Sequence, residues 1–305
     1  MSPDEFALAL RVLEAPLFLD NRGTATPLGV EFTATTSDGK SVLVTQLSPA
    51  LNGLVTHPDA FVRMLGRYGY QGAGITESGQ LYFLELLPHG VSLARRLAAT
   101  GPLPVAEIVD IARAVIDALA QLALRDDAHG MVTPETIYLG ADGVISLRWS
   151  GLVPALRAAG VEAAVIAEEL GIAAFVAPEV RQGTAPDTAA DIFALGTTLY
   201  AALTGRPPFG GRTTATMMAV VLADDGAPVT TIAGTLTAAL LRAIETNPAD
   251  RWRDLQRFRD ALGLDAKTPS ATGHKISARR GCGLAIIAVL GSGGLVLLVV
   301  AQYIS

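Results

Sequence analysis

Few residues of this chain have side chains suited to chemistry, and most of them stand alone. His129 opens the segment HGMVTPETIYL, and Asp191 opens the segment DIFALGTTLYAALTG. A lone histidine is more typical of a satisfied core residue than of a catalyst. The single cysteine, Cys282, excludes a disulfide framework and any metal site built from several cysteines of one chain. These residue types therefore predict structural roles first.

Two further charged residues stand in short motifs. Glu179 completes the tripeptide Ala-Pro-Glu, and Arg251 lies in the segment NPADRW. Lysine is absent between Ser41 and Ala266, and glutamate is absent between Thr45 and Thr76. These two stretches therefore cannot supply a lysine–glutamate ion pair, however they are aligned with another sequence.

The elements that must position these residues fall into two parts. Residues 26–47 and 72–87 carry β-branched and aromatic runs separated by turns, which is typical of strands. From about residue 92 the apolar residues follow helical spacing, as in VAEIVDIARAVIDALAQLAL. A strand-rich first third followed by a helical remainder predicts an α+β, two-lobed fold.

Taken in order, these segments resemble a protein kinase. HGMVTPETIYL resembles the family's catalytic loop, VISLRWSG its magnesium-loop strand, and Ala-Pro-Glu the end of its activation segment. DIFALGTTLYAALTG resembles the central helix, NPADRW precedes a closing helix, and FLELLPHGVSLARRL resembles the hinge. The resemblance spans roughly residues 20–263 and points to the bacterial receptor-type serine/threonine kinases. It implies a strand-rich N-lobe, a helical C-lobe and a membrane helix after the domain.

The resemblance also implies which residues would transfer phosphate, and these positions have changed. Phosphoryl transfer depends on a lysine at the phosphates, acidic and amide ligands for Mg²⁺, and an aspartate that receives the substrate proton. The family's phosphate lysine, catalytic aspartate, catalytic-loop lysine, metal-binding asparagine and metal-binding aspartate are replaced, in that order, by Thr45, Met131, Thr133, Thr136 and Trp149. We therefore expect a pseudokinase without catalytic residues, without a metal site and without Mg-ATP binding.

Other matching positions keep the residue that the family uses for structure. Glu179 and Arg251 match a buried ion pair, Asp191 matches the residue that holds the catalytic-loop backbone, and His129 is retained. The residues that could still line a ligand cleft are Gly23, Glu85 and Leu87. The activation segment has no hydroxyl from Gly151 to Gln182, and its Ala-rich part, AAGVEAAVIAEELGIAAF, predicts a fixed helix.

The end of the chain predicts a membrane anchor. Residues 281–301 carry no charge, and a helix of that length spans about 30 Å, which matches the hydrocarbon core of a bilayer. Lys275, Arg279 and Arg280 precede this stretch, which places the N-terminal domain in the cytoplasm in a single-pass arrangement. The expected organisation is an N-terminal helix or extension (1–20), a kinase-like domain (21–264), a basic juxtamembrane linker (265–280), a transmembrane helix (281–301) and a short extracytoplasmic tail (302–305).

The function expected from these features is a membrane-anchored pseudokinase that acts as a protein-binding scaffold or regulator in signalling. Two alternatives stay open: an ATP-binding serine/threonine kinase with a divergent active site, and a non-catalytic nucleotide or ligand sensor. The expected partners are cytoplasmic or membrane signalling proteins, among them an active kinase acting on the linker hydroxyls, and membrane lipid around the C-terminal helix. The net charge of −6 argues against a nucleic-acid partner.

Overall fold

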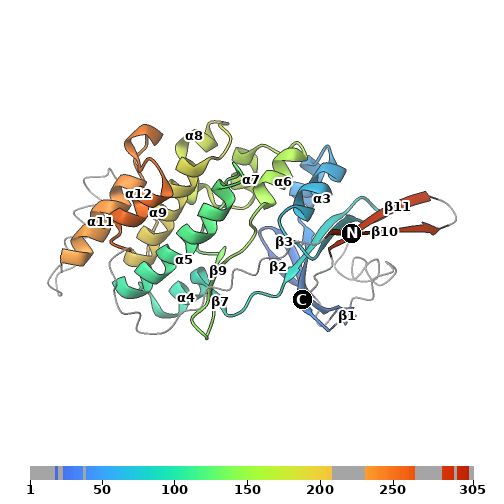
Figure 1. The fold of residues 1–305 in the computed structure, drawn as a ribbon, viewed down its shortest axis with the longest axis horizontal. Helices are drawn as coiled ribbons and strands as arrows, with labels where there is room; N and C mark the ends of the chain where they lie inside the picture. The colour runs from blue at the N-terminus through green and yellow to red at the C-terminus, as the bar shows by residue number, and fades with distance from the viewer. Residues whose placement is uncertain are drawn as a thin grey trace. The chain divides into compact units, whose positions relative to one another are not determined.

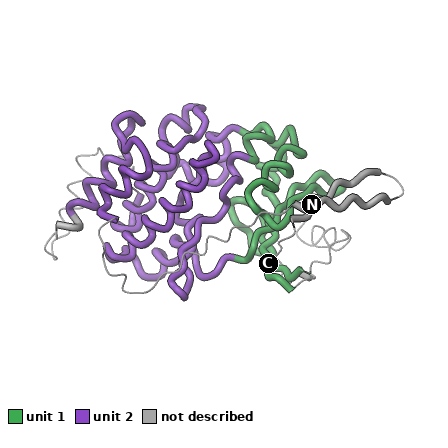
Figure 2. Tube along the Cα trace, viewed as in Figure 1, with its two compact units in different colours: residues 1–87, 155–161, 278–305 green, residues 88–154, 162–277 purple. Residues whose placement is uncertain are grey.

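A computed structural model describes residues 18–19, 23–36, 39–207, 231–264, 284–291 and 294–301. Contacts divide the chain into two compact units, coloured separately in Figure 2. Unit 1 comprises residues 1–87, 155–161 and 278–305, and unit 2 comprises residues 88–154 and 162–277. The expected strand-rich first third, followed by a mostly helical part, is confirmed within the described residues up to Leu264. The predicted N-terminal helix, the linker and the final tail lie mostly or wholly outside those residues.

Unit 1 is built on one antiparallel sheet with the strand order β1-β3-β4-β6-β5, and β2 also pairs with β3. The strands of this sheet are β1 (Phe18–Leu19), β2 (Thr24–Thr26), β3 (Gly29–Thr35), β4 (Ser41–Leu47), β5 (Gly72–Ile75) and β6 (Leu81–Leu86). The turn between β3 and β4 is closed by Thr36, whose hydroxyl donates to the Lys40 carbonyl and accepts from the Lys40 N–H. β4 is buried along its length after Ser41, including its polar residues Thr45 and Gln46.

Two helices follow β4 in unit 1, α2 (Pro49–Leu54) and α3 (Pro58–Gly66). Ser48 caps α2 by accepting a hydrogen bond from the Leu51 N–H, and a proline begins each helix, as its fixed φ favours. Phe61 of α3 is buried, and its ring meets the Phe83 ring of β6 edge to face at 6.4 Å between centroids. This contact fixes which face of the sheet α3 covers.

Unit 2 is organised around two long helices, α5 (Val105–Ala123) and α9 (Thr188–Thr204), which pack against each other (Figure 1). α5 is amphipathic, and its polar side pairs Arg113 with Asp110 at 2.8 Å. α9 is buried on all sides from Ala190 to Ala202 and ends at Gly205, whose φ of 74° suits a helix cap. Gly196 brings α9 close to α11 (Thr231–Ala243), because a Cβ there would lie 2.7 Å from the Ala243 Cβ.

The remaining elements of unit 2 are short. Arg259 of α12 (Leu255–Ala261) forms an ion pair with Asp117 of α5, which joins the closing helix to the core helices. A small antiparallel sheet runs in the order β7-β8-β9. Its strands are β7 (Val91–Ser92), β8 (Ile137–Leu139) and β9 (Ile145–Leu147). The other elements are the helices α4 (Leu93–Thr100), α6 (Leu152–Ala158), α7 (Ala163–Glu169) and α8 (Pro178–Arg181) and the 3-10 turns Ala173–Phe175 and Pro248–Asp250. The part of α6 from Ala155 onward belongs to unit 1.

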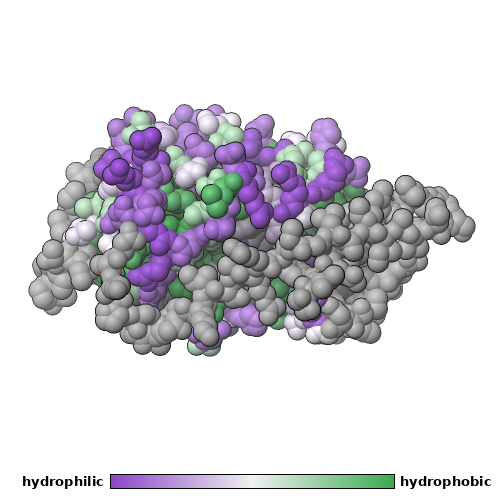
Figure 3. Space-filling view, viewed as in Figure 1, coloured by the Kyte–Doolittle hydropathy of each residue, from purple (hydrophilic) through white to green (hydrophobic). Residues whose placement is uncertain are grey.

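The surface has the distribution expected for these amphipathic helices. On the face drawn in Figure 3, hydrophilic side chains cover much of the described surface, with hydrophobic residues visible between them. Large apolar side chains exposed among the described residues are scattered singly, at Leu54, Leu86, Val91 and Leu124. Scattered exposure of this kind is ordinary for a folded domain.

The C-terminal stretch differs from its prediction. Where the sequence predicts a helix over residues 281–301, the described part forms two strands, β10 (Leu284–Gly291) and β11 (Gly294–Ala301), which pair antiparallel. Among the described residues, no helix combines the length and the apolar character needed to cross a bilayer. The reason lies in the composition: Val, Ile and Leu suit a strand as well as a membrane helix, and Gly291 pairs with Gly294 at the ends of the two strands.

Candidate functional site

The loop that opens with His129 is held by one carboxylate of α9. Asp191 accepts hydrogen bonds from the backbone N–H groups of His129, at 2.7 Å, and Gly130, at 2.8 Å. Burial raises the pKa of Asp191 to about 7; the two N–H donors act in the opposite direction, and nearby Asp187 adds to the rise. The predicted role of Asp191, to hold this loop by its backbone, agrees with these contacts.

His129 is a fully buried residue whose two ring nitrogens both have backbone neighbours. Its Nδ1 accepts from the Met131 N–H at 3.2 Å, so Nε2 carries the proton and donates to the Arg148 carbonyl at 2.8 Å. Burial lowers the pKa of His129 to about 4, against the opposing effect of the Arg148 carbonyl. A neutral imidazole with both nitrogens engaged is a structural group, in agreement with the sequence interpretation.

The next residues of the loop carry the changed positions. Met131 is buried, and the Val132 carbonyl accepts from the Thr198 hydroxyl of α9 at 3.1 Å. The Thr136 hydroxyl accepts from the Thr133 N–H and donates to the Thr133 carbonyl, each at 2.9 Å. Thr136 is therefore occupied in closing a turn, and its oxygen is not presented to a ligand.

Thr133 and Thr45, like Thr197 of α9, share one property. Each side chain is buried, and each hydroxyl oxygen lacks a hydrogen-bond partner in the structure. Thr133 belongs to unit 2, whereas Thr45 sits in β4 of unit 1, opposite Glu31 on β3 and Phe83 on β6. An unpartnered buried hydroxyl costs about 1–3 kcal/mol, so these two positions are not optimised for stability.

Trp149 has a backbone conformation that tryptophan rarely adopts. Its φ is +63°, in the left-handed region. The Arg148 guanidinium lies over the Trp149 ring at 4.8 Å and over the Tyr138 ring at 5.1 Å, and it donates to the Tyr138 hydroxyl at 3.0 Å. Sequence reasoning missed this stacked cluster, because only the fold brings β8 and the end of β9 together.

The three proposed cleft residues all lie in unit 1. Gly23 has a φ of +86°, and a Cβ there would lie 2.7 Å from the side chains of Phe32 and Val30. Glu85 pairs across the sheet with Leu43, and the Leu87 N–H donates to the Ser41 carbonyl at 3.1 Å. The loop residues from His129 to Trp149 lie in unit 2, so the two sets belong to different units.

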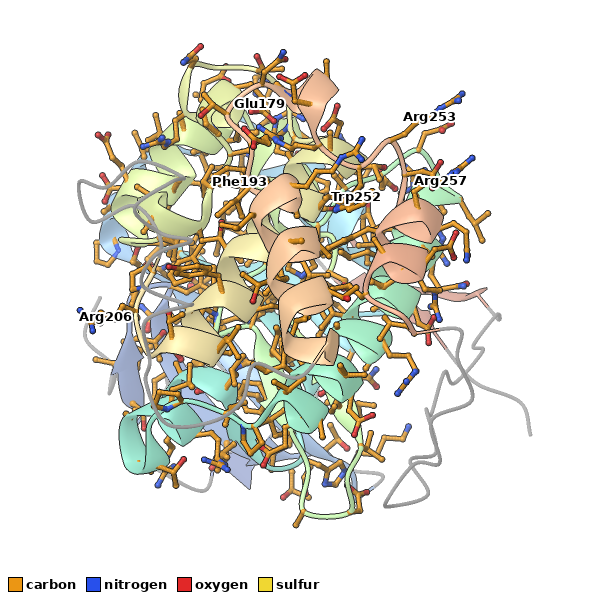
Figure 4. All side chains as sticks on the ribbon, turned by 90° about the vertical axis from the view of Figure 1, so that its left-hand side faces the viewer. Glu179, Phe193, Arg206, Trp252, Arg253 and Arg257 are labelled. Carbon is orange, nitrogen blue, oxygen red and sulfur yellow. The ribbon has the colours of Figure 1, made fainter. Side chains whose placement is uncertain are left out.

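Glu179 and Arg251 form the ion pair that the sequence predicted. Arg251 Nη1 and Nη2 donate to the two carboxylate oxygens of Glu179 at 2.6 and 2.7 Å. The other donors of Arg251 reach the carbonyls of Glu245, Ala189 and Thr246, so all five N–H groups of the guanidinium have acceptors. The guanidinium also lies over the Phe193 ring at 4.8 Å; Figure 4 labels Glu179 and Phe193. Although burial acts to raise it, Arg251 holds the pKa of Glu179 below its usual value.

The segment between Trp149 and Ala-Pro-Glu is fixed by its backbone. The Ala159 carbonyl accepts from the Thr56 N–H at 2.9 Å, the His57 N–H at 3.1 Å and the Thr56 hydroxyl at 3.1 Å, all within unit 1. Gly160, with a φ of +96°, leaves room for this approach, since a Cβ there would lie 2.2 Å from the Thr56 hydroxyl oxygen. The helix expected over AAGVEAAVIAEELGIAAF is shorter in the structure: α6 ends at Ala158, before Gly160, and the rest of this stretch holds α7 and the 3-10 turn Ala173–Phe175. No sequence signal marks the Thr56 contact.

The described residues offer no obvious metal centre. Within them, no group of three or more histidine, cysteine, aspartate or glutamate side chains could hold a metal ion. The positions that the sequence resemblance matches to the family's Mg²⁺ ligands carry the Trp149 indole and the Thr136 hydroxyl, and the hydroxyl already makes two hydrogen bonds. These side chains do not fit a hard divalent cation, which takes carboxylate, carbonyl and water oxygens.

Comparisons with known proteins agree with this architecture. A family model described as the protein kinase domain matches residues 69–253, which is more than half of the chain. Serine/threonine-protein kinase PknL of Mycobacterium tuberculosis (strain H37Rv) is 32% identical over 176 residues, covering 56% of this chain and 43% of that protein. Serine/threonine-protein kinase PknB of the same strain is 26% identical over 196 residues, covering 63% of this chain and 31% of that protein. The chain thus spans less than half the length of either relative, and it belongs to the bacterial serine/threonine protein kinase-like family.

Proposed function

We propose that this protein is a pseudokinase that regulates signalling by binding other proteins. The observation that carries the proposal is the state of the positions where the family does its chemistry. Thr136 is tied into a turn, Met131 is buried, and Trp149 stands where a metal-binding carboxylate would be needed. Phosphoryl transfer is mostly charge neutralisation and positioning, and these side chains supply neither.

Mg-ATP does not fit the side chains at these positions. The Thr45 and Thr133 hydroxyls are buried and uncharged, so neither neutralises a phosphate as the ammonium group of lysine does. We therefore propose that the chain works without this cofactor. The scaffold around the lost positions is retained, through Asp191 in the loop and through the Glu179–Arg251 pair.

We further propose that the protein is attached to a membrane with its domain in the cytoplasm. The support is sequence: residues 281–301 carry no charge, and Lys275, Arg279 and Arg280 precede them. Two open strands in lipid would leave edge N–H and C=O groups unpaired, so inside a bilayer we expect this stretch to be helical. Attachment raises the effective concentration of the domain for signalling proteins in the same membrane.

We propose that one partner of this protein is an active kinase. The linker carries Thr268, Ser270, Thr272 and Ser277, which such a kinase could phosphorylate. The segment from Gly151 to Gln182 has no hydroxyl, and the Ala159 carbonyl holds part of it in place. Regulation by phosphorylation would therefore act outside the activation segment.

Thermal unfolding of the full chain with ATP, with and without Mg²⁺, tests the pseudokinase proposal. We expect no nucleotide-dependent shift and no transfer of labelled phosphate to the chain or to a generic substrate protein. The matched control is the triple variant Thr45→Lys, Thr136→Asn, Trp149→Asp, which restores a phosphate cation and two metal ligands and should regain an Mg²⁺-dependent shift. Transfer by the natural chain, dependent on Mg²⁺, would overturn the proposal.

A divergent serine/threonine kinase is the second candidate, and specific observations favour it. The loop backbone is held by Asp191 as in the family, and the relatives are named as serine/threonine-protein kinases. This candidate requires a cation from arginine, since no lysine lies between Ser41 and Ala266. The same phosphotransfer assay decides between the two functions.

Membrane attachment has its own test. After cell lysis we expect the full chain to sediment with membranes and to resist extraction by alkaline carbonate, while a chain ending at Leu264 stays in the supernatant. Circular dichroism of a peptide covering 275–305 should show helix in lipid vesicles. Extraction of the full chain by carbonate would contradict the proposal.

A further inference from the structure

A threonine outside the segment Gly151–Gln182 holds part of that segment. The segment contains no Ser, Thr or Tyr, so it offers no hydroxyl of its own for modification. The Thr56 hydroxyl, however, donates to the Ala159 carbonyl at 3.1 Å. Residues 155–161 belong to unit 1 together with residues 1–87, as Figure 2 shows. A modification of Thr56 therefore acts on the segment from outside it.

The contact is tight on the side of the hydroxyl that faces the segment. A Cβ on Gly160 would overlap the Thr56 hydroxyl oxygen, so this oxygen lies directly against the Gly160 backbone. A phosphoryl group on Thr56 adds a phosphorus and three oxygens, and it replaces the proton that the Ala159 carbonyl accepts. Phosphorylation therefore removes the hydroxyl from this contact.

The hydroxyl lies on an exposed connection between two helices. Residues 55–57 join α2 to α3, and both Thr56 and His57 are exposed. Val55 has an extended backbone, with a φ of −73° and a ψ of 119°, and Pro58 begins α3, so neither helix includes Thr56. An exposed, non-helical connection is a place where an enzyme reaches a side chain without unfolding the domain. The opening of one hydrogen bond at the surface frees the hydroxyl.

We propose that Thr56 is a phosphorylation site, and that its phosphorylation releases residues 155–161 from the connection between α2 and α3. This site rests on the proposed function in one respect, because an active serine/threonine kinase must be a partner. That kinase transfers the terminal phosphoryl group of a nucleoside triphosphate. The bond from the Thr56 oxygen to phosphorus forms, the bond from phosphorus to the nucleoside diphosphate breaks, and the hydroxyl proton passes to a base of the kinase.

The groups that could bind a phosphate at Thr56 lie at the surface. The His57 Nδ1 lies 2.8 Å from the Thr56 oxygen, and Arg157 is exposed two residues before Ala159. These groups attract the phosphate toward solvent, whereas the Ala159 carbonyl oxygen repels it. The first turn of α3 also attracts anions, but it already carries Asp59. Ion pairs at the surface contribute little, so they do not replace the lost hydrogen bond to the segment.

Release changes the surface that other proteins meet. Leu156 and Val161, on either side of Ala159 in the chain, are 0% and 3% exposed. Once residues 155–161 leave the connection between α2 and α3, these apolar side chains become accessible. Exposed apolar patches are typical of protein-binding sites, so phosphorylation of Thr56 creates a surface for a protein partner.

Hydrogen exchange of the full-length chain carrying phosphothreonine at position 56 tests the release. The reporters are the Thr56 and His57 amides, which donate to the Ala159 carbonyl, and the amides of residues 159–161. We expect exchange about tenfold or more faster at these amides, with unchanged protection in α9. The matched control carries phosphothreonine at Thr184, an exposed position of unit 2, and should exchange like the unmodified chain at every reporter. Equal exchange in all three proteins would overturn the proposed release.

The site itself is tested with serine/threonine-protein kinase PknB of Mycobacterium tuberculosis, Mg²⁺ and ATP acting on the full-length chain, followed by mass spectrometry. We expect phosphate on Thr56, and Thr56→Val should lose that phosphopeptide while keeping any phosphate on Thr268 and Thr272 of the linker. Phosphate on the linker alone, or none on the chain, would refute the assignment of Thr56. The pseudokinase proposal is decided separately, by nucleotide binding and phosphate transfer with this chain alone, so either proposal can fail without the other.

Discussion

Arg251 and Thr133 both lie in unit 2 and are both buried, but they differ in the hydrogen bonding of their polar atoms. Arg251 is buried, and every one of its five N–H groups finds an acceptor, two of them on Glu179. Thr133 is buried as well, but its hydroxyl has no partner. The ion pair that joins these segments of the kinase-like domain is thus fully satisfied at Arg251. Thr133, which the sequence resemblance matches to the family's catalytic-loop lysine, carries an unpartnered hydroxyl.

The largest effect should come from breaking the satisfied side of this comparison. Arg251→Met leaves Glu179 without its cation, and removing one partner of a buried pair costs about 3–5 kcal/mol of unfolding free energy. Urea unfolding followed by circular dichroism measures the loss. Arg251→Lys is the matched control, because it keeps the charge but not the bidentate geometry, and it should lose less. A loss below about 1 kcal/mol for Arg251→Met would contradict this account.

His129 and Asp191 extend this comparison to the pH dependence of the unfolding free energy. The pKa of His129 is lowered to about 4, so its contribution to stability is lost as pH falls from 6.5 toward 4. The pKa of Asp191 is raised to about 7, so its contribution is lost as pH rises from 3.8 toward 7. Each term amounts to about 3–4 kcal/mol over that window, and the two oppose each other.

Because the two terms oppose each other, the unfolding free energy of the natural chain should vary less between pH 4 and 7 than that of either single variant. Asp191→Asn leaves the His129 term, so its stability should rise with pH, whereas His129→Gln leaves the Asp191 term and should give the opposite slope. The readout is the slope, which is independent of the absolute loss that each variant suffers. Parallel profiles for the two variants would show that these groups do not set the pH dependence.

Gly160 tests whether the segment before Ala-Pro-Glu is also scaffold. Gly160→Ala places a Cβ at a φ of +96° and 2.2 Å from the Thr56 hydroxyl oxygen, so we expect a loss of about 2–3 kcal/mol. The matched control is Gly171→Ala, which has a φ of +65° but open space around it, and which should cost about 1 kcal/mol. Thermal unfolding of both variants gives the difference, and equal losses would remove the steric argument.

The smallest effect belongs to the orphaned hydroxyls. Thr133→Val removes an oxygen that has no partner, so the expected change lies within about 1 kcal/mol of zero and toward stabilisation. Thr136→Val removes an oxygen that makes two hydrogen bonds and should cost about 1–3 kcal/mol. A substantial loss for Thr133→Val would mean that its hydroxyl is engaged, and the contrast with Arg251 would then fail.

Much of the fold could be predicted from local pattern. Strand-like runs at 26–47 and 72–87 and helical spacing after residue 92 correspond to β3 through β6 and to α4 onward. The Glu179–Arg251 pair and the Asp191 contacts were predictable because the family motifs carry them at recognisable positions. The C-terminal stretch was not, since an uninterrupted apolar run has no periodicity that separates a strand from a helix.

Less of the site than of the fold could be predicted from the sequence. Sequence gives the type of residue at Trp149 and Thr136, but not the left-handed backbone of the first or the turn that occupies the second. The Thr56–Ala159 contact joins residues that are 103 positions apart, and no motif marks it. Contacts of this kind depend on how helices and strands come together, which composition and spacing do not encode.

The left-handed backbone of Trp149 affects which substitutions are favourable at this position. A tryptophan codon becomes a glycine codon by one nucleotide substitution, and glycine would relieve the left-handed backbone that costs tryptophan about 1–2 kcal/mol. The same substitution would remove the ring beneath the Arg148 guanidinium. Drift toward glycine in close relatives would mark the ring as dispensable. Persistence of an aromatic residue there would mean that selection acts on the stacked cluster itself.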